Sequence, residues 1–367
     1  MILHLISVEP KRHSHSTLKM PQKIKKQFAL LSLFSGAGAL DQGFDLTGRF
    51  ITHACVEFEP IFCQTLKANQ SSGFLSQAAI INDSVTALDP NDVIRLHFKG
   101  SAPDGIIGGP PCETFSVRGK KKGLNDPKGS LVFSFLDWVI AIKPKFFLME
   151  NVPPLATLNN GSTIALLCKM ASNAGYATSY SILNAADFGA PTKRRRLFIV
   201  GILDGKPIDW PEASHCEIPG LFSKKPYVTS GEALAGLPEL SWSYPGEPHG
   251  HIGVRHTAIV AERFAALKQG QQDNVRKRTR LHLLKPSPTL VAGNLQGIRS
   301  HIHPTEPREL TNRESARLHG FADSFIFAGG HSAMGKQIAN SVPIALSRAM
   351  GNAIAAHLDS GIVNKKS

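Results

Sequence analysis

The chain has 367 residues, of which 42% are hydrophobic, and its Lys and Arg residues outnumber Asp and Glu by 13. This length and composition allow a sizeable core and are typical of a large domain joined to a smaller one. No apolar stretch approaches the ~20 residues that span a membrane, so the sequence excludes an integral membrane protein. The positive charge favours a polyanionic partner such as nucleic acid, although a membrane surface also fits it.

The five cysteines are widely spaced and form no Cys-x-x-Cys pair. Their arrangement argues against both a zinc site and a disulfide framework, and it favours a reducing, cytoplasmic compartment. Residues 1–27 are basic and histidine-containing, and they lack the charge order of a signal peptide and the pattern of a core segment. We expect a disordered tail there.

From Phe28 onward, short apolar runs alternate with amphipathic segments, which predicts buried parallel strands separated by helices. The expected strands are Phe28–Phe34, Ile51–Phe58, Ala78–Ile81, Asp104–Gly109, Lys145–Asn151 and, later, Arg195–Leu203. The clearest helices between them are Pro60–Asn69 and Ser130–Ile142. This order predicts an α/β fold with a doubly wound, mostly parallel sheet.

The character of the chain changes after Asp204. Up to about Arg280 it is rich in Pro, Gly, His and aromatic residues and has little periodicity, which indicates a second, loop-rich domain. Helical patterning returns at Thr311–Gly320 and again at Lys336–His357.

Three successive strand ends carry residues suited to one nucleoside. The first strand leads into Gly36 and Gly38, where the backbone can approach a ligand closely at a helix amino terminus. Glu57 ends the second strand and can accept hydrogen bonds from ribose hydroxyls, and Asp83 follows the third, near an adenine edge. The third glycine of a nicotinamide-binding loop is missing, so S-adenosylmethionine fits better than NAD. Any one of these residues alone is better explained as an ordinary turn residue.

The fourth strand leads into "GGPPCETFSVRGKKKG", residues Gly108–Gly123. Its thiol, Cys112, is placed at the carboxyl edge of the sheet, whereas Cys55, Cys63 and Cys168 sit among apolar or helical neighbours and are best explained as structural. Four cations follow Cys112, and they favour a thiolate and can also contact a phosphate backbone. They are Arg118, Lys120, Lys121 and Lys122.

The fifth strand ends in "FLMENVPP", which presents Glu150 at the same edge as Cys112. A nucleophile and a carboxyl group beside a methyl donor suit cytosine, because C5 of cytosine is too electron-poor to accept a methyl group directly. Addition of a thiolate to C6 makes C5 nucleophilic, and a carboxyl group at N3 stabilises the charge that this addition creates.

With these motifs in place, the chain resembles the DNA (cytosine-5)-methyltransferases of bacterial restriction-modification systems. The resemblance covers about Phe28–His357, in the order of the family's motifs. They are "LFSGAG", "GGPPCETFSVRGKKKGLNDPKGSL", "MENVPP", "APTKRRRLFIVG", "PSPTLVAG", "RELTNRESARLHGF" and "KQIANSVPIALSRAMGNAI".

The resemblance implies a role for each matching residue. Cys112 is expected to attack C6 of a cytosine flipped out of duplex DNA, and Glu150 to engage N3 and the exocyclic amine. Arg194 and Arg196 match the basic pair of the family and are also expected to be catalytic, with Arg196 at the cytosine carbonyl oxygen. The implied S-adenosylmethionine contacts are Phe34, Gly36, Gly38, Glu57, Phe58, Asp83, Pro111, Leu131, Asn340 and Val342.

The last motif implies that the carboxyl-terminal helix returns to the first strand, so that both ends of the chain build the catalytic domain. We expect catalytic segments at 28–202 and 335–360 and a target-recognition domain at 203–334. Within it, Arg276, Arg278 and Arg280 are candidate DNA contacts, and a solvated basic turn explains each equally well.

Three positions depart from the family pattern: Ser32, where an acidic residue is common, Thr192, where glutamine is usual, and Ala339, where glycine is usual. None of the three removes a group that the chemistry needs.

Several other functions share parts of this pattern. A transfer-RNA cytosine methyltransferase typically carries a "CFT" motif, which this sequence lacks. A regulator without catalysis is expected to lose Cys112 or Glu150, and a nicotinamide oxidoreductase offers no role for Cys112. The sequence leaves open whether the enzyme protects host DNA beside a separate restriction endonuclease or is an orphan or phage-borne regulatory methyltransferase. We expect a monomer.

Overall fold

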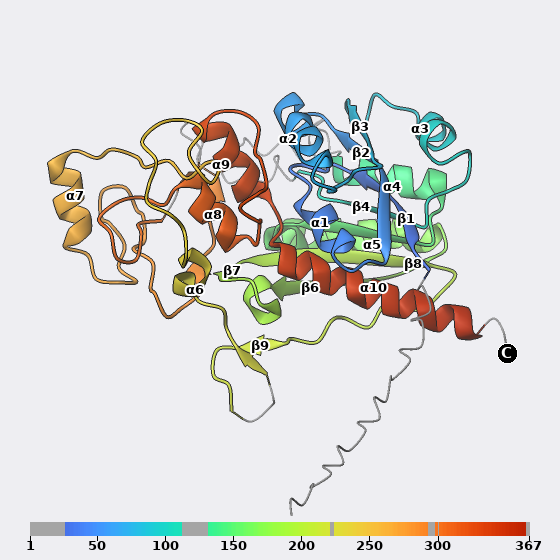
Figure 1. Cartoon of the computed structure of the whole chain (residues 1–367). Helices are drawn as coiled ribbons and strands as arrows, with labels where there is room; N and C mark the ends of the chain where they lie inside the picture. The colour runs from blue at the N-terminus through green and yellow to red at the C-terminus, as the bar shows by residue number, and fades with distance from the viewer. Residues whose placement is uncertain (1–25, 112–130, 221–223, 293–297, 300, 365–367) are drawn as a thin grey trace, which may run out of the picture.

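A computed structural model describes residues 26–111, 131–220, 224–292, 298–299 and 301–364 of the chain. Its centre is a seven-stranded sheet in the order β3-β2-β1-β4-β5-β8-β6 (Figure 1). The strands are β1 Phe28–Leu33, β2 Phe50–Glu57, β3 Ala79–Asn82, β4 Gly105–Gly108, β5 Phe146–Asn151, β6 Tyr176–Asn184 and β8 Arg195–Leu203. Strands β1 to β5 pair in parallel, and β8 is antiparallel to both β5 and β6. The predicted α/β class and all six predicted strands are confirmed.

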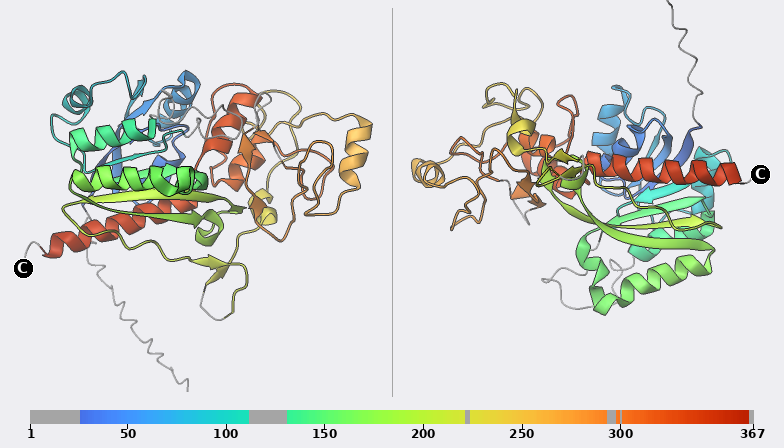
Figure 2. Two further views of the ribbon diagram at one scale, coloured as in Figure 1. Left: turned by 180° about the vertical axis from the view of Figure 1, so that it is seen from behind. Right: turned by 90° about the horizontal axis from the view of Figure 1, so that it is seen from below.

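Helices cover both faces of the sheet (Figure 2). On one face, α3, α4 and α5 pack into one buried apolar cluster with β1, β4 and β5. On the other face, α1 and α10 share a second cluster with β1, β5 and β8. The helices are α1 Ala39–Asp45, α2 Pro60–Gln70, α3 Pro90–His97, α4 Leu131–Ile142, α5 Ser162–Asn173 and α10 Ile344–Asn364. This is a doubly wound arrangement.

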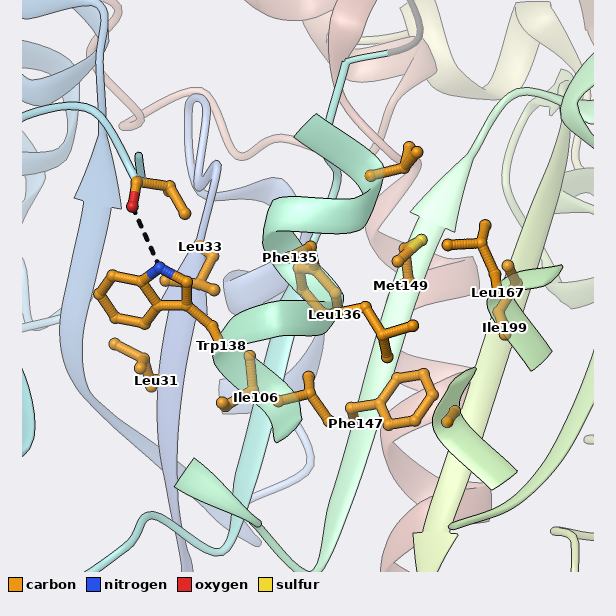
Figure 3. Close-up of a cluster of buried hydrophobic side chains, with 14 of the residues drawn as sticks. Leu31, Leu33, Ile106, Phe135, Leu136, Trp138, Phe147, Met149, Leu167 and Ile199 are labelled. Atoms are coloured by element: carbon orange, nitrogen blue, oxygen red, sulfur yellow. Dashed lines mark hydrogen bonds between the residues drawn. The ribbon is translucent and has the colours of Figure 1, made fainter. Parts of the chain in front are cut away.

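Helix α4 shows how a continuous apolar run becomes a buried layer (Figure 3). Phe135, Leu136 and Trp138 are all buried against the sheet, and the ring of Phe135 meets that of Phe147 edge-on, with centroids 6.3 Å apart. The indole Nε1–H of Trp138 donates to the carbonyl oxygen of Val85 at 3.0 Å, which satisfies its polar atom inside the core.

Strand β6 was absent from the sequence prediction. Its residues mix polar and apolar side chains without a continuous apolar run, and they are mostly half-buried because β6 is an edge strand of the sheet. The predicted helix at Lys336–His357 is two helices, α9 (His331–Asn340) and α10. The break falls just before Pro343, whose ring cannot follow a helical turn.

The segment after β8 has few regular elements and lies beside the sheet, with α7 on the side away from it (Figures 1 and 2). Its helices are α6 Ser230–Leu234, α7 Ala258–Ala265 and α8 Asn312–Leu318. Its two-residue strands are β9 His215–Cys216, β10 Lys225–Pro226, β11 Ser287–Pro288, β12 Val291–Ala292 and β13 Ile298–Arg299. Strand β11 pairs with β7 (Thr192–Lys193), which joins this segment to the catalytic edge of the sheet. Among the described helices, none is both long and apolar enough to cross a membrane.

The carboxyl-terminal helix closes the fold by packing on α1. Phe44 of α1 and Met350 of α10 are buried in the same apolar cluster. The guanidinium of Arg49 makes a two-pronged ion pair with Asp359, with N–O distances of 2.7 and 2.9 Å. At the crossing of the helices, a Cβ added to Gly43 would lie 2.1 Å from the Cβ of Ser347. The two ends of the described chain therefore build one core.

We expect Gly43→Ala to destabilise the protein by about 2 kcal/mol, because the added methyl group forces α1 away from α10. Gly361→Ala is the matched control. It lies in α10 with open space around its Cα, so it should stabilise the protein by roughly 0.5–1 kcal/mol through helix propensity. Urea denaturation of both variants measures the difference, and equal stabilities would contradict the proposed close packing of α1 and α10.

Candidate active site

The carboxyl ends of the parallel strands meet at one edge of the sheet, and the predicted site residues follow them. After β1, Phe34, Gly36 and Gly38 all have positive φ, of 54°, 57° and 77°. A Cβ added to Gly36 would meet no atom within 4 Å, so the backbone there faces open space. A Cβ on Gly38 would lie 2.7 Å from the ring of Phe74. Gly36 therefore suits a ligand, whereas Gly38 is required for packing.

Glu57, at the end of β2, organises the glycine loop. Its two carboxylate oxygens accept hydrogen bonds from the backbone N–H groups of Gly36 at 2.7 Å and of Glu59 at 2.8 Å. Burial raises the pKa of the Glu57 carboxyl group, and these backbone donors partly offset the rise. The sequence predicted Glu57 as a ligand contact, but it did not reveal that the same carboxylate fixes the loop.

The neighbouring strand ends leave two side chains open beside Glu57. Phe58 is 68% exposed, which is unusual for a phenylalanine, and Asp83 is exposed after β3. The side-chain amide of Asn82 donates to the carbonyl oxygens of Glu57 at 3.1 Å and of Phe58 at 2.9 Å. The sequence analysis missed Asn82, and its place at a strand end was the only signal for it.

A buried ion pair lies at the end of β5. The Nε atom of Arg196 is 2.7 Å from Oε1 of Glu150, and both side chains are almost entirely buried. They meet because β8 runs antiparallel to β5, so the start of one strand lies beside the end of the other. Burial raises the pKa of Glu150, while the charges of Arg196 and Arg194 lower it. The carboxyl group is thus suited to hold a proton at its edge of the sheet.

The backbone that leads toward Cys112 packs against Glu150 and is hydrogen-bonded to Asn151. A Cβ added to Gly109 would lie 2.9 Å from Oε2 of Glu150, so only glycine leaves room for the carboxylate. The side-chain amide of Asn151 donates to the carbonyl oxygen of Pro110 at 2.9 Å. The predicted nucleophile and four predicted DNA contacts lie outside the described residues: Cys112, Arg118, Lys120, Lys121 and Lys122.

Arg194 differs from Arg196 in its surroundings. It is 2% exposed, and its guanidinium donates to the carbonyl oxygen of Leu290 at 2.8 Å and to that of Ala339. Both carbonyls belong to segments far along the chain, so Arg194 fastens them to the sheet. These contacts are structural, and the catalytic role expected for Arg194 stays a prediction.

The other predicted cofactor contacts differ in exposure. Pro111 and Asn340 are exposed, Leu131 is half-buried, and Val342 is 5% exposed within the core between β1 and α10. Val342 can therefore offer a ligand little more than its backbone.

The candidate DNA-contacting arginines have partners within the protein. Arg276 and Arg278 both pair with Glu309. Arg280 is 9% exposed, and its guanidinium donates to four backbone carbonyl oxygens. These carbonyl oxygens occupy donors of Arg280 and hold the loop-rich segment together, so the predicted DNA contact does not fit its buried position. Among the described residues, no group of three or more His, Cys, Asp or Glu side chains is placed to hold a metal ion.

The fold and this edge of the sheet define an α/β methyltransferase, a class supported by structural comparison. A prophage-encoded E. coli protein described as a DNA modification methyltransferase is 26% identical, with a TM-score of 0.74, over 91% of this chain and all of that one. The S. pombe Dnmt2 methyltransferase, at 14% identity and a TM-score of 0.59 over 91% of this chain and 99% of its own, shares the fold.

The family model of C-5 cytosine-specific DNA methylases matches residues 28–356. The Type II methyltransferase M1.HphI of Haemophilus parahaemolyticus is 35% identical over 88% of this chain and 86% of its own. M.NgoFVII of Neisseria gonorrhoeae is 33% identical over 86% and 83%. The chain belongs to the C-5 cytosine-specific DNA methylase family and is a DNA (cytosine-5)-methyltransferase.

The ion pair predicts a pH-dependent loss of stability in Arg196→Met. Because the pKa of Glu150 is higher in the folded than in the unfolded state, its carboxyl group takes up a proton on folding, and stability falls as pH rises between the two values. Removing Arg196 raises the folded-state pKa further, so Arg196→Met should lose more stability at about pH 8 than at about pH 5. Thermal unfolding across this range measures the effect.

The control combines Arg196→Met with Glu150→Gln, which removes the titrating group. Its stability relative to the wild-type protein should vary less with pH than that of Arg196→Met. Equal pH dependence in the two variants would show that Glu150 is not the titrating group.

Proposed function

We propose that this enzyme transfers a methyl group from S-adenosylmethionine to C5 of a cytosine flipped out of a specific duplex DNA sequence, through a covalent bond between Cys112 and C6. The observation that carries the proposal is the buried pair of Glu150 and Arg196 against Gly109, three residues before Cys112. The family match covers all of these positions.

Cys112, Glu150 and Arg196 have separate roles in the proposed reaction with cytosine. Attack of the Cys112 thiolate forms a carbon–sulfur bond at C6 and moves an electron pair toward N3 and the carbonyl oxygen of the base. Glu150, whose pKa is raised by burial, supplies a proton at N3, and the positive charge of Arg196 stabilises the electron-rich carbonyl. C6 is then saturated, and the double bond lies between C4 and C5, which makes C5 the nucleophilic carbon of an enamine. Once C5 has accepted the methyl group, loss of the C5 hydrogen as a proton re-forms the C5=C6 bond and expels the Cys112 sulfur, and return of the N3 proton to Glu150 restores the aromatic ring.

The first three strand ends fit S-adenosylmethionine, which supplies an electrophilic methyl group when bound. The open backbone at Gly36 allows close approach, and the exposed ring of Phe58 offers an apolar surface for an adenine. The carboxylates of Glu57 and Asp83 are acceptors for ribose hydroxyls and the adenine amine. The proposal also includes Asn340 and Val342 of the carboxyl-terminal motif, together with Phe34, Pro111 and Leu131.

The proposal also assigns catalysis and target recognition to different segments of the chain. Residues 28–202 and 335–360 carry catalysis, and 203–334 recognise the target, with Arg276 and Arg278 as candidate DNA contacts once they exchange Glu309 for phosphate. Cations after Cys112 would hold the backbone near the flipped base.

The named relatives are Type II methyltransferases, which supports a role in protecting host DNA beside a separately acting restriction endonuclease. A prophage-encoded structural relative supports a second candidate, a phage-borne methyltransferase with a regulatory role. In either case we propose a cytoplasmic monomer.

A target cytosine bearing fluorine at C5 tests the covalent step. Fluorine cannot leave as a proton does, so the methylated base should remain bonded to the enzyme, and the complex should survive denaturing electrophoresis. Cys112→Ser should abolish this complex and nearly all methylation, because a hydroxyl stays protonated where a thiol ionises, while duplex binding persists. A serine variant with near wild-type activity, or an adduct mapped by mass spectrometry to another cysteine, would sink the proposed mechanism.

The cofactor site predicts that Glu57→Ala weakens S-adenosylmethionine binding by roughly 1–3 kcal/mol, because it removes an acceptor and releases the Gly36 loop. Isothermal titration calorimetry measures the affinity. Glu59→Ala is a useful control, since the Glu59 side chain pairs with Lys336 and only its backbone contacts Glu57. Equal affinities for wild-type and Glu57→Ala protein would remove Glu57 from the site.

A further inference from the structure

His319, the residue that ends α8, is fully buried and has no part in the chemistry described above. Its Nδ1 atom lies 2.7 Å from the hydroxyl oxygen of Ser341. That hydroxyl also lies 2.7 Å from the carbonyl oxygen of Ile338. When it donates its hydrogen to this carbonyl, it accepts from the Nδ1–H group of the imidazole. Burial and the charges of Arg194 and Arg196 lower the pKa of His319, which favours the neutral ring in this arrangement.

The hydrogen bond holds one short turn between α9 and α10. The backbone N–H of Ile344 donates to the carbonyl oxygen of His319 at 3.0 Å, which fastens the far end of the turn to the same residue. At the end of α9, just before the turn, the guanidinium of Arg194 donates a hydrogen bond to the carbonyl oxygen of Ala339. The turn is thus held from two sides; it contains Val342, and Asn340, the last residue of α9, leads into it.

The imidazole also lies within electrostatic range of Arg194 and Arg196. After burial, the positive charges of Arg194 and Arg196 are the causes that lower the pKa of His319 well below its ordinary value. Its Nε2 atom is buried and has no hydrogen-bond partner within the part of the chain that the structure describes. An apolar side chain could fill the same space without a buried unpaired nitrogen, so packing alone does not explain a histidine here.

We propose that His319 is a positioning residue for the cofactor: through Ser341 it fixes the turn that carries Asn340 and Val342 beside the arginines of the base pocket. The inference rests on the proposed cofactor role of that turn. It predicts that cofactor binding depends on the hydrogen bond between Nδ1 and Ser341 and does not depend on the volume of the imidazole ring.

Two amide substitutions separate these roles. The amide nitrogen of His319→Asn occupies the place of Nδ1 and can donate to Ser341, whereas that of His319→Gln extends one atom further, to the place of Nε2. We expect His319→Gln to raise the KM for S-adenosylmethionine and the Kd for S-adenosylhomocysteine about tenfold, with kcat within about twofold of wild type. His319→Asn should restore most of the affinity. A packing role predicts the opposite order, because glutamine is closer to histidine in volume.

Ser341→Ala keeps the proposal testable even if substitutions of His319 prevent folding. It removes only the acceptor of the hydrogen bond, and it should raise the Kd for S-adenosylhomocysteine by a similar factor. The double variant His319→Gln with Ser341→Ala should be no weaker than either single variant, as expected for one shared interaction. Unchanged Kd values with lowered melting temperatures would overturn the positioning role.

The wild-type protein separates this proposal from the proposed function. If it binds S-adenosylhomocysteine and Ser341→Ala and His319→Gln bind it equally well, His319 loses its role and the cofactor site stands. If the wild-type protein itself does not bind, both the cofactor assignment and the inference built on it fail.

Discussion

The arrangement of the catalytic edge depends on keeping the Glu150 carboxylate buried beside Arg196. A carboxylate taken out of water needs a partner with good geometry, and the antiparallel course of β8 supplies one at 2.7 Å. The same carboxylate explains Gly109, since a side chain there would collide with it. Gly109, which leads toward the proposed nucleophile, is thus required by the carboxyl group on the neighbouring strand β5, and this links the order of the strands to the proposed chemistry.

A second constraint follows from the chain's course, which leaves the sheet after β8 and returns to it at α10. The long excursion could move relative to the sheet unless it is fastened. Arg194 ties Leu290 and Ala339 to the strand that also carries Arg196, and the pairing of β7 with β11 adds a backbone link. The residues expected to contact the base and those expected to contact the cofactor therefore share one rigid support, which a reaction between two bound molecules requires.

The sequence predicted what local patterns determine. Apolar runs predicted six of the seven strands of the main sheet. Their order also predicted that Glu57 and Glu150 lie at the same edge of the sheet, because parallel strands end on one side. The predictions failed where the environment of a residue or strand depends on partners that are distant in the sequence. Strand β6 is half-exposed at an edge and lacks the apolar run, and Arg280 reads as one cation of a basic turn although Phe264 and Pro304 accept its hydrogen bonds. Nothing in the motif distinguished Arg194, which supports the site, from Arg196, which faces Glu150.

Buried arginines reduce the share of the chain's positive charge that is available to contact DNA. Arg313 is fully buried and donates to the carbonyl oxygens of His249, Ala322 and Phe325, and Arg308 pairs with Glu306 and Glu314. Such side chains cannot release counterions from DNA, since they are already occupied within the protein. The salt dependence of binding reports only those cations that reach phosphates. The excess of 13 positive charges therefore does not give the number of cations that reach phosphates. The structural arginines also explain why the loop-rich segment after β8, with little secondary structure, still has a defined shape.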